Sequence, residues 1–399
     1  MKKILFVSTL DSKLEESKYI INKLNLNVNK LIIFDIGIKK TTSIKSNINR
    51  KKLIESTGYK KKQIEKLREP SKMLDIFSIG AKKIINKLYE QNKFDIICSI
   101  GGGKGTALFS SIIEDLPLSV PKFIITSARP AMISKICERQ NIIVFPTPID
   151  FFGLNYLNRK TLDNYTSSIL SIKKSEKLIK KKRKIIGITS FGVTTTAVNL
   201  CIKLLKIKNY DSVVLPANGV GGRFFEKLIN EKYFDGIIDL TTSEIADEVV
   251  GGTASAGKRR LTSAIKMQIP QIVSTGAIDM VNFSSLNTVP KKFLKRNLYQ
   301  HTKFTTLMRT NVNENIKIAK IMAKRLKNKN SKCSVIYPKK GFSDYDKKNK
   351  FFYGPKENES WLKTFNKYKY KNIELIITNN HINDTEFANT IVEWIQNNV

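Results

Sequence analysis

The sequence predicts an α/β protein built from two doubly wound domains, and three observations support this fold class. Short, nearly continuous apolar segments recur along the chain, which is typical of parallel strands covered on both faces. Amphipathic stretches with apolar residues at helical spacing separate these segments, as at residues 74–90. The same alternation begins again after a dense basic run at residues 173–184, so the chain contains two such halves.

In the first half, five apolar segments are expected to form one parallel sheet. They are KILFVST (3–9), KLIIFDI (30–36), FDIICSI (94–100), PKFIITS (121–127) and NIIVFP (141–146). Helical patterns lie between them, and a long helical stretch at about 155–181 leads out of the domain. Residues 39–66 are rich in lysine and only weakly periodic, which predicts a mobile excursion.

The second half repeats this pattern with six apolar segments, each followed by a helical pattern. They are KIIGITSF (184–191), DSVVLPANG (211–219), FDGIIDLTT (234–242), PQIVSTG (270–276), CSVIYP (333–338) and IELIITNN (373–380). Residues 340–356 resemble the earlier lysine-rich excursion. Because 399 residues are long for a single core, we expect two domains, residues 1–183 and 184–399.

Composition indicates the cellular environment of the protein. No apolar run approaches the roughly 18 residues of a membrane span, and the start of the chain is too briefly apolar for a signal peptide. We therefore expect a cytosolic protein without membrane association. The four cysteines form no C-x-x-C pair, which disfavours a disulfide framework or a thiolate zinc site. We expect them to be reduced and mostly buried.

The formal net charge of +36 suggests an acidic partner such as nucleic acid. Two features argue against that reading. Only 12 of the 70 basic residues are arginine, and the lysines are spread along the chain, whereas an RNA-binding face would favour arginines with interleaved exposed aromatic residues. The dense run at 173–184 lies where an interdomain linker is expected. A solvated, lysine-rich surface is therefore the favoured interpretation, and nucleic-acid binding is disfavoured.

A glycine-rich stretch, SIGGGKGTAL at 99–108, lies at a predicted strand-to-helix turn. It is not a P-loop, because Lys104 precedes Gly105, and it lacks the spacing of the dinucleotide fingerprint. Its glycines still allow close approach of the backbone to an anion, which the positive end of the following helix would attract. The alternative is a glycine-rich turn without a ligand.

Functional residues should gather after each predicted strand, because ligands of open α/β sheets bind at the carboxyl ends of the strands. In the first half these loops provide hydroxyl groups, backbone amides, two acids (Asp11 and Asp150) and three cations (Lys13, Lys104 and Arg129). Such a set could hold a polyphosphate. Thr9 or Ser12 could instead cap the following helix.

The second half offers a comparable set of loops. Residues 216–229 form another glycine-rich turn, in which Arg223 could clamp a carboxylate or phosphate. Glu244 and Asp247, or Glu244 and Glu248, share one face if residues 243–250 are helical. The only two histidines, His301 and His381, lie in later loops.

Two histidines could hold a metal together with one of Asp239, Asp279 or Asp384, but a polar substrate site is favoured. A hydrolase of the nucleophile-elbow kind is disfavoured because G-x-S-x-G is absent, as is H-E-x-x-H. In the structural alternative, His381 orders its own loop, and Asn383 or Asp384 caps the last helix.

Ten motifs, in this order along nearly the whole chain, resemble one known family. They are STLDSK, GGGKGTAL, PTPIDFFGLN, SFGVTTTAV, NGVGGRFFEKL, DLTTSEIADEVVGG, SAGKRRL, VSTGAIDMVNF, TLMRT and HINDTEFA. The chain is similar to the Tm-one-like ATP-binding family, which contains microbial proteins of unassigned function and a plant protein that inhibits replication of tomato mosaic virus.

The resemblance implies two Rossmann-like domains with mostly parallel sheets, a homodimer, and ATP bound by the N-terminal domain. The implied nucleotide-binding residues are Thr9, Asp11, Lys13, Gly101, Gly102, Gly103, Lys104, Gly105, Thr106, Asp150 and Gly153. Two positions depart from the family pattern: Lys104 replaces a small residue, and SARP at 127–130 replaces a small, glycine-containing stretch. Both add positive charge near the expected phosphates, which either strengthens anion binding or closes the pocket.

The leading hypothesis is an ATP-dependent or ATP-regulated enzyme, with or without Mg²⁺, that acts on a small polar anionic metabolite held between the domains. The alternatives are a noncatalytic ATP-binding interaction protein and, third, an RNA-binding protein that uses the basic surface. The candidate catalytic residues are Arg223, Glu244, Asp247, His301, His381 and Asp384.

Overall fold

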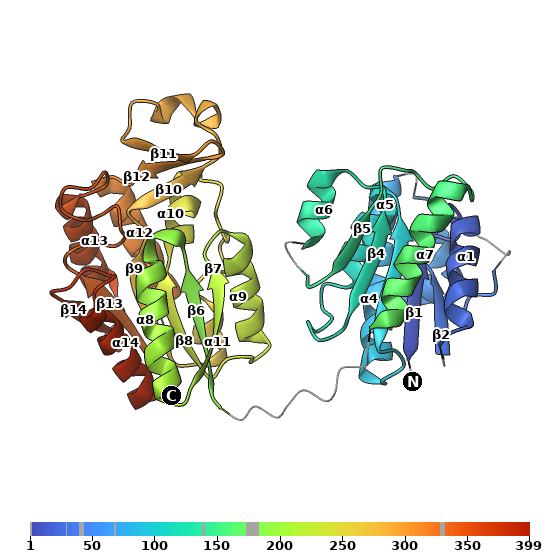
Figure 1. Cartoon of the computed structure of the whole chain (residues 1–399), viewed down its shortest axis with the longest axis horizontal. Helices are drawn as coiled ribbons and strands as arrows, with labels where there is room; N and C mark the ends of the chain where they lie inside the picture. The colour runs from blue at the N-terminus through green and yellow to red at the C-terminus, as the bar shows by residue number, and fades with distance from the viewer. Residues whose placement is uncertain are drawn as a thin grey trace. The chain divides into compact units, whose positions relative to one another are not determined.

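The computed structural model describes residues 2–28, 30–39, 44–67, 69–137, 140–172, 183–327 and 332–399. The chain forms two compact units, residues 1–178 and 179–399, which we call the N-terminal unit and the C-terminal unit (Figure 1). The predicted division at 183/184 lies close to this boundary. Most of the basic run at 173–184, and the end of the helix predicted at 155–181, fall outside the described residues.

The N-terminal unit contains a five-stranded, fully parallel sheet in the order β2-β1-β3-β4-β5, as predicted (Figure 1). The central strands are mostly apolar because both of their faces are covered. The strands are β1 (Lys3–Ser8), β2 (Lys30–Asp35), β3 (Ile96–Gly101), β4 (Lys122–Thr126) and β5 (Ile143–Pro146).

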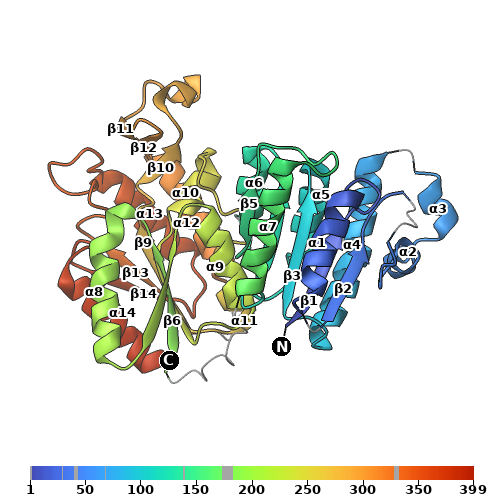
Figure 2. The same cartoon turned by 45° about the vertical axis from the view of Figure 1, so that its right-hand side comes forward.

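Helices cover both faces of this sheet (Figure 2). They are α1 (Leu14–Asn25), α2 (Arg50–Thr57), α3 (Lys61–Glu65), α4 (Pro70–Glu90), α5 (Gly103–Ile112), α6 (Pro130–Cys137) and α7 (Tyr156–Ser171). One core joins the sheet to α2, α4 and α5, and the other joins it to α1 and α7. Residues 44–66 correct the prediction of a mobile excursion: Ile48 pairs with Phe34 of β2, and Leu53 of α2 is fully buried.

The C-terminal unit is built on a six-stranded parallel sheet in the order β14-β13-β9-β8-β6-β7. Its strands are β6 (Ile185–Ser190), β7 (Asp211–Pro216), β8 (Gly236–Thr241), β9 (Gln271–Gly276), β13 (Cys333–Pro338) and β14 (Glu374–Thr378). All six correspond to predicted segments. Both units therefore have the predicted α/β fold with parallel sheets.

A second, three-stranded antiparallel sheet in the C-terminal unit is not predicted from the sequence. It contains β10 (Met280–Phe283), β11 (Leu298–Thr302) and β12 (Thr305–Arg309), in the order β10-β12-β11. Between β10 and β11 lie two short 3₁₀ helices, η2 (Leu286–Thr288) and η3 (Lys291–Phe293). This sheet stands at one end of the unit (Figure 1).

The α-helices of the C-terminal unit pack in two cores against the parallel sheet. They are α8 (Thr195–Ile207), α9 (Val220–Asn230), α10 (Ser243–Val250), α11 (Ser263–Met267), α12 (Val312–Arg325), α13 (Pro355–Tyr368) and α14 (Thr385–Asn398), with the 3₁₀ helix η1 (Gly192–Thr194) before α8. Trp361 stacks on Phe365 at 4.8 Å between ring centroids, and Trp394 is buried on α14. Both tryptophans of the protein thus lie in this unit.

Residues 340–356, predicted as a mobile excursion, fold back onto the sheet instead, and the last two of them begin α13. The carbonyl of Phe342 accepts a hydrogen bond from the amide of Ala277 at 2.8 Å. Phe342, Asp346 and Phe352 are completely buried. Hydrophobic burial therefore outweighs the high lysine content of this segment.

Two predictions from composition can be examined in the described residues. None of their helices combines the length and apolar character that crossing a membrane requires. Cys98, Cys201 and Cys333 are buried free thiols, and Cys137 is an exposed one.

Candidate functional site

The sheet order of the N-terminal unit reverses direction between β1 and β3. The chain first adds β2 on one side of β1 and then places β3, β4 and β5 on the other side. The loops after β1 and β3 consequently diverge at the carboxyl ends of these strands, which is where open α/β sheets bind ligands. We call this location the switch point.

The glycine-rich turn after β3 lies at the switch point and opens helix α5. Gly102 is the N-cap residue, and no side chain caps the helix. The first amides of a helix have no acceptor within it, so they point outward with the positive end of the helix dipole. A Cβ atom at Gly103 would meet nothing within 4 Å, and Lys104 is exposed beside it. The turn thus presents an open, positively polarised surface.

The loop after β1 lies beside this turn. A Cβ atom at Gly105 would be 3.9 Å from the Thr9 hydroxyl oxygen. Neither Thr9 nor Ser12 caps α1; their hydroxyls hydrogen-bond to each other at 2.9 Å. Asp11 points elsewhere and accepts a hydrogen bond from the amide of Lys39 at 2.8 Å. Thr9 therefore adjoins the turn, whereas Asp11 fixes the loop that follows β2.

Three further side chains bring the loops after β1, β4 and β5 together. Asp150 accepts a hydrogen bond from the Ser127 hydroxyl at 2.8 Å, and the Lys13 ammonium lies 3.9 Å from the same carboxylate oxygen. The bonds from Ser127 and from the amide of Phe151 lower the pKa of Asp150, so its half-exposed carboxylate is charged at neutral pH.

Ser127 is the residue that links this group to the glycine-rich turn. A Cβ atom at Gly102 would lie 3.8 Å from its hydroxyl oxygen. The sequence placed Ser127 after a strand but gave no reason to single it out.

The other predicted residues of this unit have structural contacts. The Thr106 hydroxyl shares a buried hydrogen bond with that of Thr126 at 2.6 Å. Gly153 has a φ of +83° and donates its amide to Glu16 at 2.8 Å. Gly101 is packed tightly, because a Cβ atom there would lie 3.1 Å from the backbone of Gly105. These residues shape the loops around the switch point.

The glycine-rich turn of the C-terminal unit differs from its N-terminal counterpart. The Glu244 carboxylate accepts hydrogen bonds from the amides of Gly219 at 2.6 Å and Gly222 at 3.1 Å. These amides lie at the beginning of α9, so Glu244 occupies the position in which an external anion would bind. A Cβ atom on Gly222 would overlap this carboxylate. The turn is filled by a side chain of the same chain.

Glu244 also belongs to a buried ion-pair cluster centred on Arg260, which is completely inaccessible to solvent. Arg260 donates from Nε to Glu244 at 2.6 Å and from both terminal nitrogens to Asp239. Glu226 lies 3.5 Å from Arg260 and also accepts the amides of Leu261 and Ser263. Burial lowers the pKa of Arg260, but the carboxylates raise it well above its ordinary value. These contacts hold Glu244 inside the buried cluster.

Asp247 is buried too, on the same helix. Its carboxylate accepts hydrogen bonds from the amide of Ala254 at 3.0 Å and from the side chain of Asn282 at 2.8 Å. It thereby holds the 251–254 turn against β10, which is a structural contact. Burial raises the pKa of Asp247 to about 7, although the hydrogen bonds from Asn282 and Ala254 oppose this shift.

The raised pKa of Asp247 predicts that stability falls as the pH rises. The folded protein holds the Asp247 proton more tightly than the unfolded chain, so this contribution is full below pH 3.8 and is lost as the pH passes about 7. Its upper limit is about 4 kcal/mol. Urea unfolding between pH 5 and pH 8 should show a steep loss in the wild type and a smaller loss in Asp247→Asn. The exposed Asp211→Asn should keep the wild-type slope; equal slopes in all three proteins would refute the assignment.

The two histidines do not share a site. His381 is buried, accepts the amide of Asn383 at Nδ1, and donates from Nε2 to the Ser343 carbonyl at 2.9 Å. His301 is exposed on β11 and hydrogen-bonds to the Tyr345 hydroxyl at 3.0 Å. No group of three or more His, Cys, Asp or Glu residues in the described ranges could hold a metal ion.

Asp384 and Arg223 complete the predicted catalytic set. Asp384 is the N-cap residue of α14, but its carboxylate accepts the amide of His381 at 2.7 Å and does not cap the helix. Arg223 is exposed and donates to the Ser255 carbonyl at 2.8 Å. Of the six predicted catalytic residues, only Arg223 and His301 are exposed.

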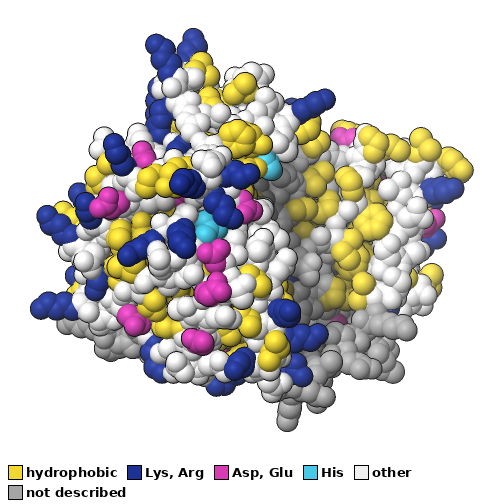
Figure 3. Space-filling view, turned by 60° about the vertical axis from the view of Figure 1, so that its left-hand side comes forward, with side chains coloured by type: hydrophobic (Ala, Val, Ile, Leu, Met, Phe, Trp, Pro, Cys, Tyr) yellow, Lys and Arg dark blue, Asp and Glu magenta, His cyan; other side chains and the backbone are white. Residues whose placement is uncertain are grey.

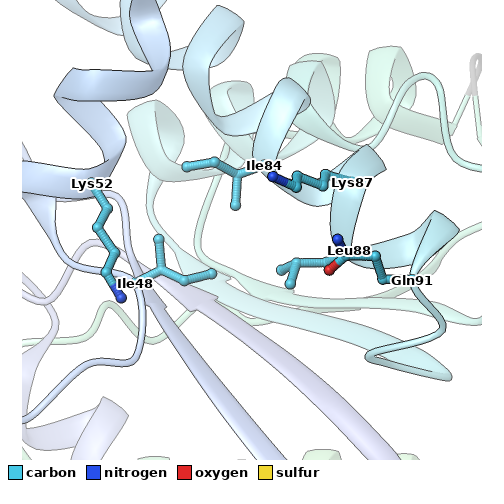
Figure 4. Close-up of a pocket in the computed structure, with 6 residues that line it drawn as sticks. All are labelled: Ile48, Lys52, Ile84, Lys87, Leu88 and Gln91. Atoms are coloured by element: carbon cyan, nitrogen blue, oxygen red, sulfur yellow. The ribbon is translucent and has the colours of Figure 1, made fainter.

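A small cavity of about 230 Å³ lies elsewhere in the N-terminal unit, between α2 and the end of α4 (Figure 4). Its floor is apolar, and lysine side chains extend along it. The lining residues are Ile48, Lys52, Ile84, Lys87, Leu88 and Gln91. None of them belongs to the predicted nucleotide-binding set.

Comparison with known proteins places the chain in a family. Residues 2–178 match the N-terminal domain, and residues 183–399 the C-terminal domain, of the uncharacterised protein family UPF0261. The chain belongs to the UPF0261 family. A UPF0261 protein of Clostridium tetani is 34% identical over 97% of this chain and 96% of its own length. Another, from Rhizobium meliloti, is 28% identical over 98% of each chain.

The family also includes a plant protein, in agreement with the resemblance found in the motifs. The tomato ToMV resistance protein Tm-1(GCR237) is 34% identical over 76% of this chain, which spans only 41% of the plant protein. Among solved structures, this chain matches that of S. aureus MnaA with UDP at a TM-score of 0.24 and 10% identity, over 68% of this chain and 79% of that one. A likeness this weak supports no inference about a ligand.

Proposed function

We propose that the N-terminal unit of this protein binds ATP at the switch point, with the phosphates at the beginning of α5. The observation that carries the proposal is the uncapped first turn of α5, which is open at Gly103. Backbone amides at a helix N-terminus bind phosphate oxygens without needing a particular sequence motif. The comparable turn of the C-terminal unit is filled by Glu244, so the two turns differ where a phosphate would bind.

The surrounding charges support a polyphosphate ligand. Lys104 and Arg129 are exposed beside the turn, in the two places where the sequence departs from the family pattern. Neither side chain fills the space at Gly103. Their charge therefore favours the first of the two predicted consequences, stronger anion binding. Asp150 offers a charged carboxylate oxygen that could hold Mg²⁺ together with the phosphates.

We further propose that the protein is a cytosolic homodimer, and that it uses the bound ATP to drive or regulate chemistry on a small anionic metabolite. Arg223, which donates to the Ser255 carbonyl, and the nearby stretch with Lys258 and Arg259 offer exposed cations that suit an anionic substrate. Exposed apolar side chains at Phe152, Tyr156 and Leu157 suit a contact between two copies.

The test of ATP binding is calorimetry on Gly103→Val at near-physiological salt, with and without Mg²⁺. The valine side chain extends into open space, so the variant should fold normally and obstruct only the approach of the phosphates. We expect saturable binding to the wild type and at least about a tenfold loss in the variant, which corresponds to 1.4 kcal/mol.

Gly192→Val is the matched control, because a Cβ atom at Gly192 also meets nothing within 4 Å but lies in the other unit. It should bind ATP as the wild type does. Absence of binding to the wild type, or equal binding by the wild type and Gly103→Val, would refute the proposed site.

A further inference from the structure

Two stretches that are far apart in the sequence meet at the three-stranded sheet of the C-terminal unit. One is residues 299–304, which cover most of β11 and the turn into β12. The other is residues 345–353, part of the segment that folds back after β13. Tyr299 stacks on Phe351 with 4.5 Å between ring centroids, and the side chain of Asn297 donates to the Phe351 carbonyl at 2.8 Å. We call the joint surface the aromatic face.

Aromatic rings dominate this face and remain partly open to solvent. Tyr345 contacts Tyr299 edge to face at 5.1 Å and hydrogen-bonds to His301. Phe351 is 58% exposed, Tyr353 49% and Phe304 81%. Folding normally buries phenylalanine, so this group of exposed rings indicates a surface that contacts another molecule.

Lysines neighbour the exposed rings along the chain. Lys303 is adjacent to Phe304, and Lys347, Lys348 and Lys350 immediately precede Phe351. All four are exposed. The stretch from 284 to 305 contains no acidic residue, and of the two aspartates at 344–346, Asp346 is buried. Figure 3 shows Lys and Arg side chains among hydrophobic ones at the end of the unit that carries β11 and β12.

We propose that the aromatic face binds single-stranded nucleic acid. Every base presents a flat ring that can stack on an exposed aromatic side chain, and lysines placed between the rings neutralise the phosphates of the strand. Tyr299 already holds Phe351 in a fixed orientation, so part of the stacking platform is formed before binding. Recognition would be independent of sequence, because the face offers rings and charges in place of a set of hydrogen bonds to base edges.

From the sequence, nucleic-acid binding is disfavoured because the basic residues are mostly lysines spread along the chain. The fold gathers some of them with aromatic rings at one place, since β11 positions Tyr299 and His301 beside residues 345–353. The net charge alone would attract any polyanion. The aromatic rings provide the specific element that the experiment isolates.

The first experiment measures the fluorescence anisotropy of a labelled 15-nucleotide oligo(U) or oligo(dT) titrated with the full-length protein. Phe351→Ala should weaken binding by roughly 5-fold to 100-fold, as expected for the loss of one stacked base. Tyr368→Ala is the matched control: Tyr368 is 51% exposed and also has lysines near its ring, but it lies on α13 outside the aromatic face. It should bind as the wild type does.

A second pair of variants tests the lysines. Lys347→Gln/Lys348→Gln should lower the slope of log affinity against log salt by about 1.4, if each lysine neutralises one phosphate. Lys206→Gln/Lys208→Gln removes the same charge from exposed positions at the end of α8 and should leave the slope unchanged. Circular dichroism verifies that all variants fold.

Several results would overturn the proposal. Equal weakening by Phe351→Ala and Tyr368→Ala would mean that no particular face binds the strand. Equal effects of the two lysine pairs would show attraction by net charge only. Binding to vesicles containing phosphatidylserine, with no measurable binding to either oligonucleotide, would identify the aromatic face as a membrane contact instead.

Discussion

Replacing Arg260 with methionine should destabilise the C-terminal unit by about 3–5 kcal/mol, because it leaves several buried carboxylates without their cation. Arg260 has no solvent-accessible surface and contacts Asp239, Glu244 and Glu226. Methionine fills much of the same volume but cannot offset their charge. Urea unfolding followed by tryptophan fluorescence measures this unit directly, because both tryptophans lie in it.

The neighbouring residue provides the control for this prediction. Arg259 is exposed, so Arg259→Met should change the free energy of unfolding by no more than about 0.5 kcal/mol. The deficit of Arg260→Met should also shrink at pH 5, where carboxylates freed from the arginine take up protons more easily. Similar stabilities for the two variants at pH 7 would show that the cluster contributes little.

Replacing Gly222 with alanine should also lower the stability of the C-terminal unit markedly. Alanine usually favours a helix over glycine, but here its Cβ atom would overlap the Glu244 carboxylate. Glu244 is held by Arg260 and by the amide of Gly219, so it cannot move without breaking those bonds. We expect a loss of about 1–3 kcal/mol, the usual range for overpacking, measured by thermal unfolding.

Gly192→Ala is the control for this substitution, since its Cβ atom would enter open space in the same unit. It should be nearly neutral. If Gly222→Ala were as stable as Gly192→Ala, the carboxylate of Glu244 would have to lie away from the start of α9.

The parallel sheets could be predicted because their strands are apolar on both faces, which leaves a clear pattern in the sequence. The antiparallel sheet could not be predicted, because the sequence of β11 is LYQHT, which mixes polar with aromatic residues along an exposed edge. The prediction of a mobile excursion at 340–356 is wrong for a related reason. Its lysines dominate the composition, whereas the buried side chains of Phe342, Asp346 and Phe352 decide its conformation.

The candidate site residues are likewise predictable from the sequence only in part. The condition under which Glu244 and Asp247 would share a face is met, since 243–250 is the helix α10. It could not indicate which partner the carboxylate meets, because the amides of α9 and the side chain of Arg260 approach it only in the folded unit. Arg259 and Arg260 are adjacent and chemically identical, yet one is solvated and the other buried. Only the tertiary fold distinguishes them.

The position of Glu244 has a consequence for stoichiometry. Both units have a glycine-rich turn after a parallel strand, so the sequence alone would allow two phosphate-binding turns for each chain. The turn at α9 is already neutralised by Glu244, and opening it would expose the positive charge of Arg260. If ATP binds at α5 as proposed, each chain should therefore take up a single nucleotide, however high the ATP concentration is raised.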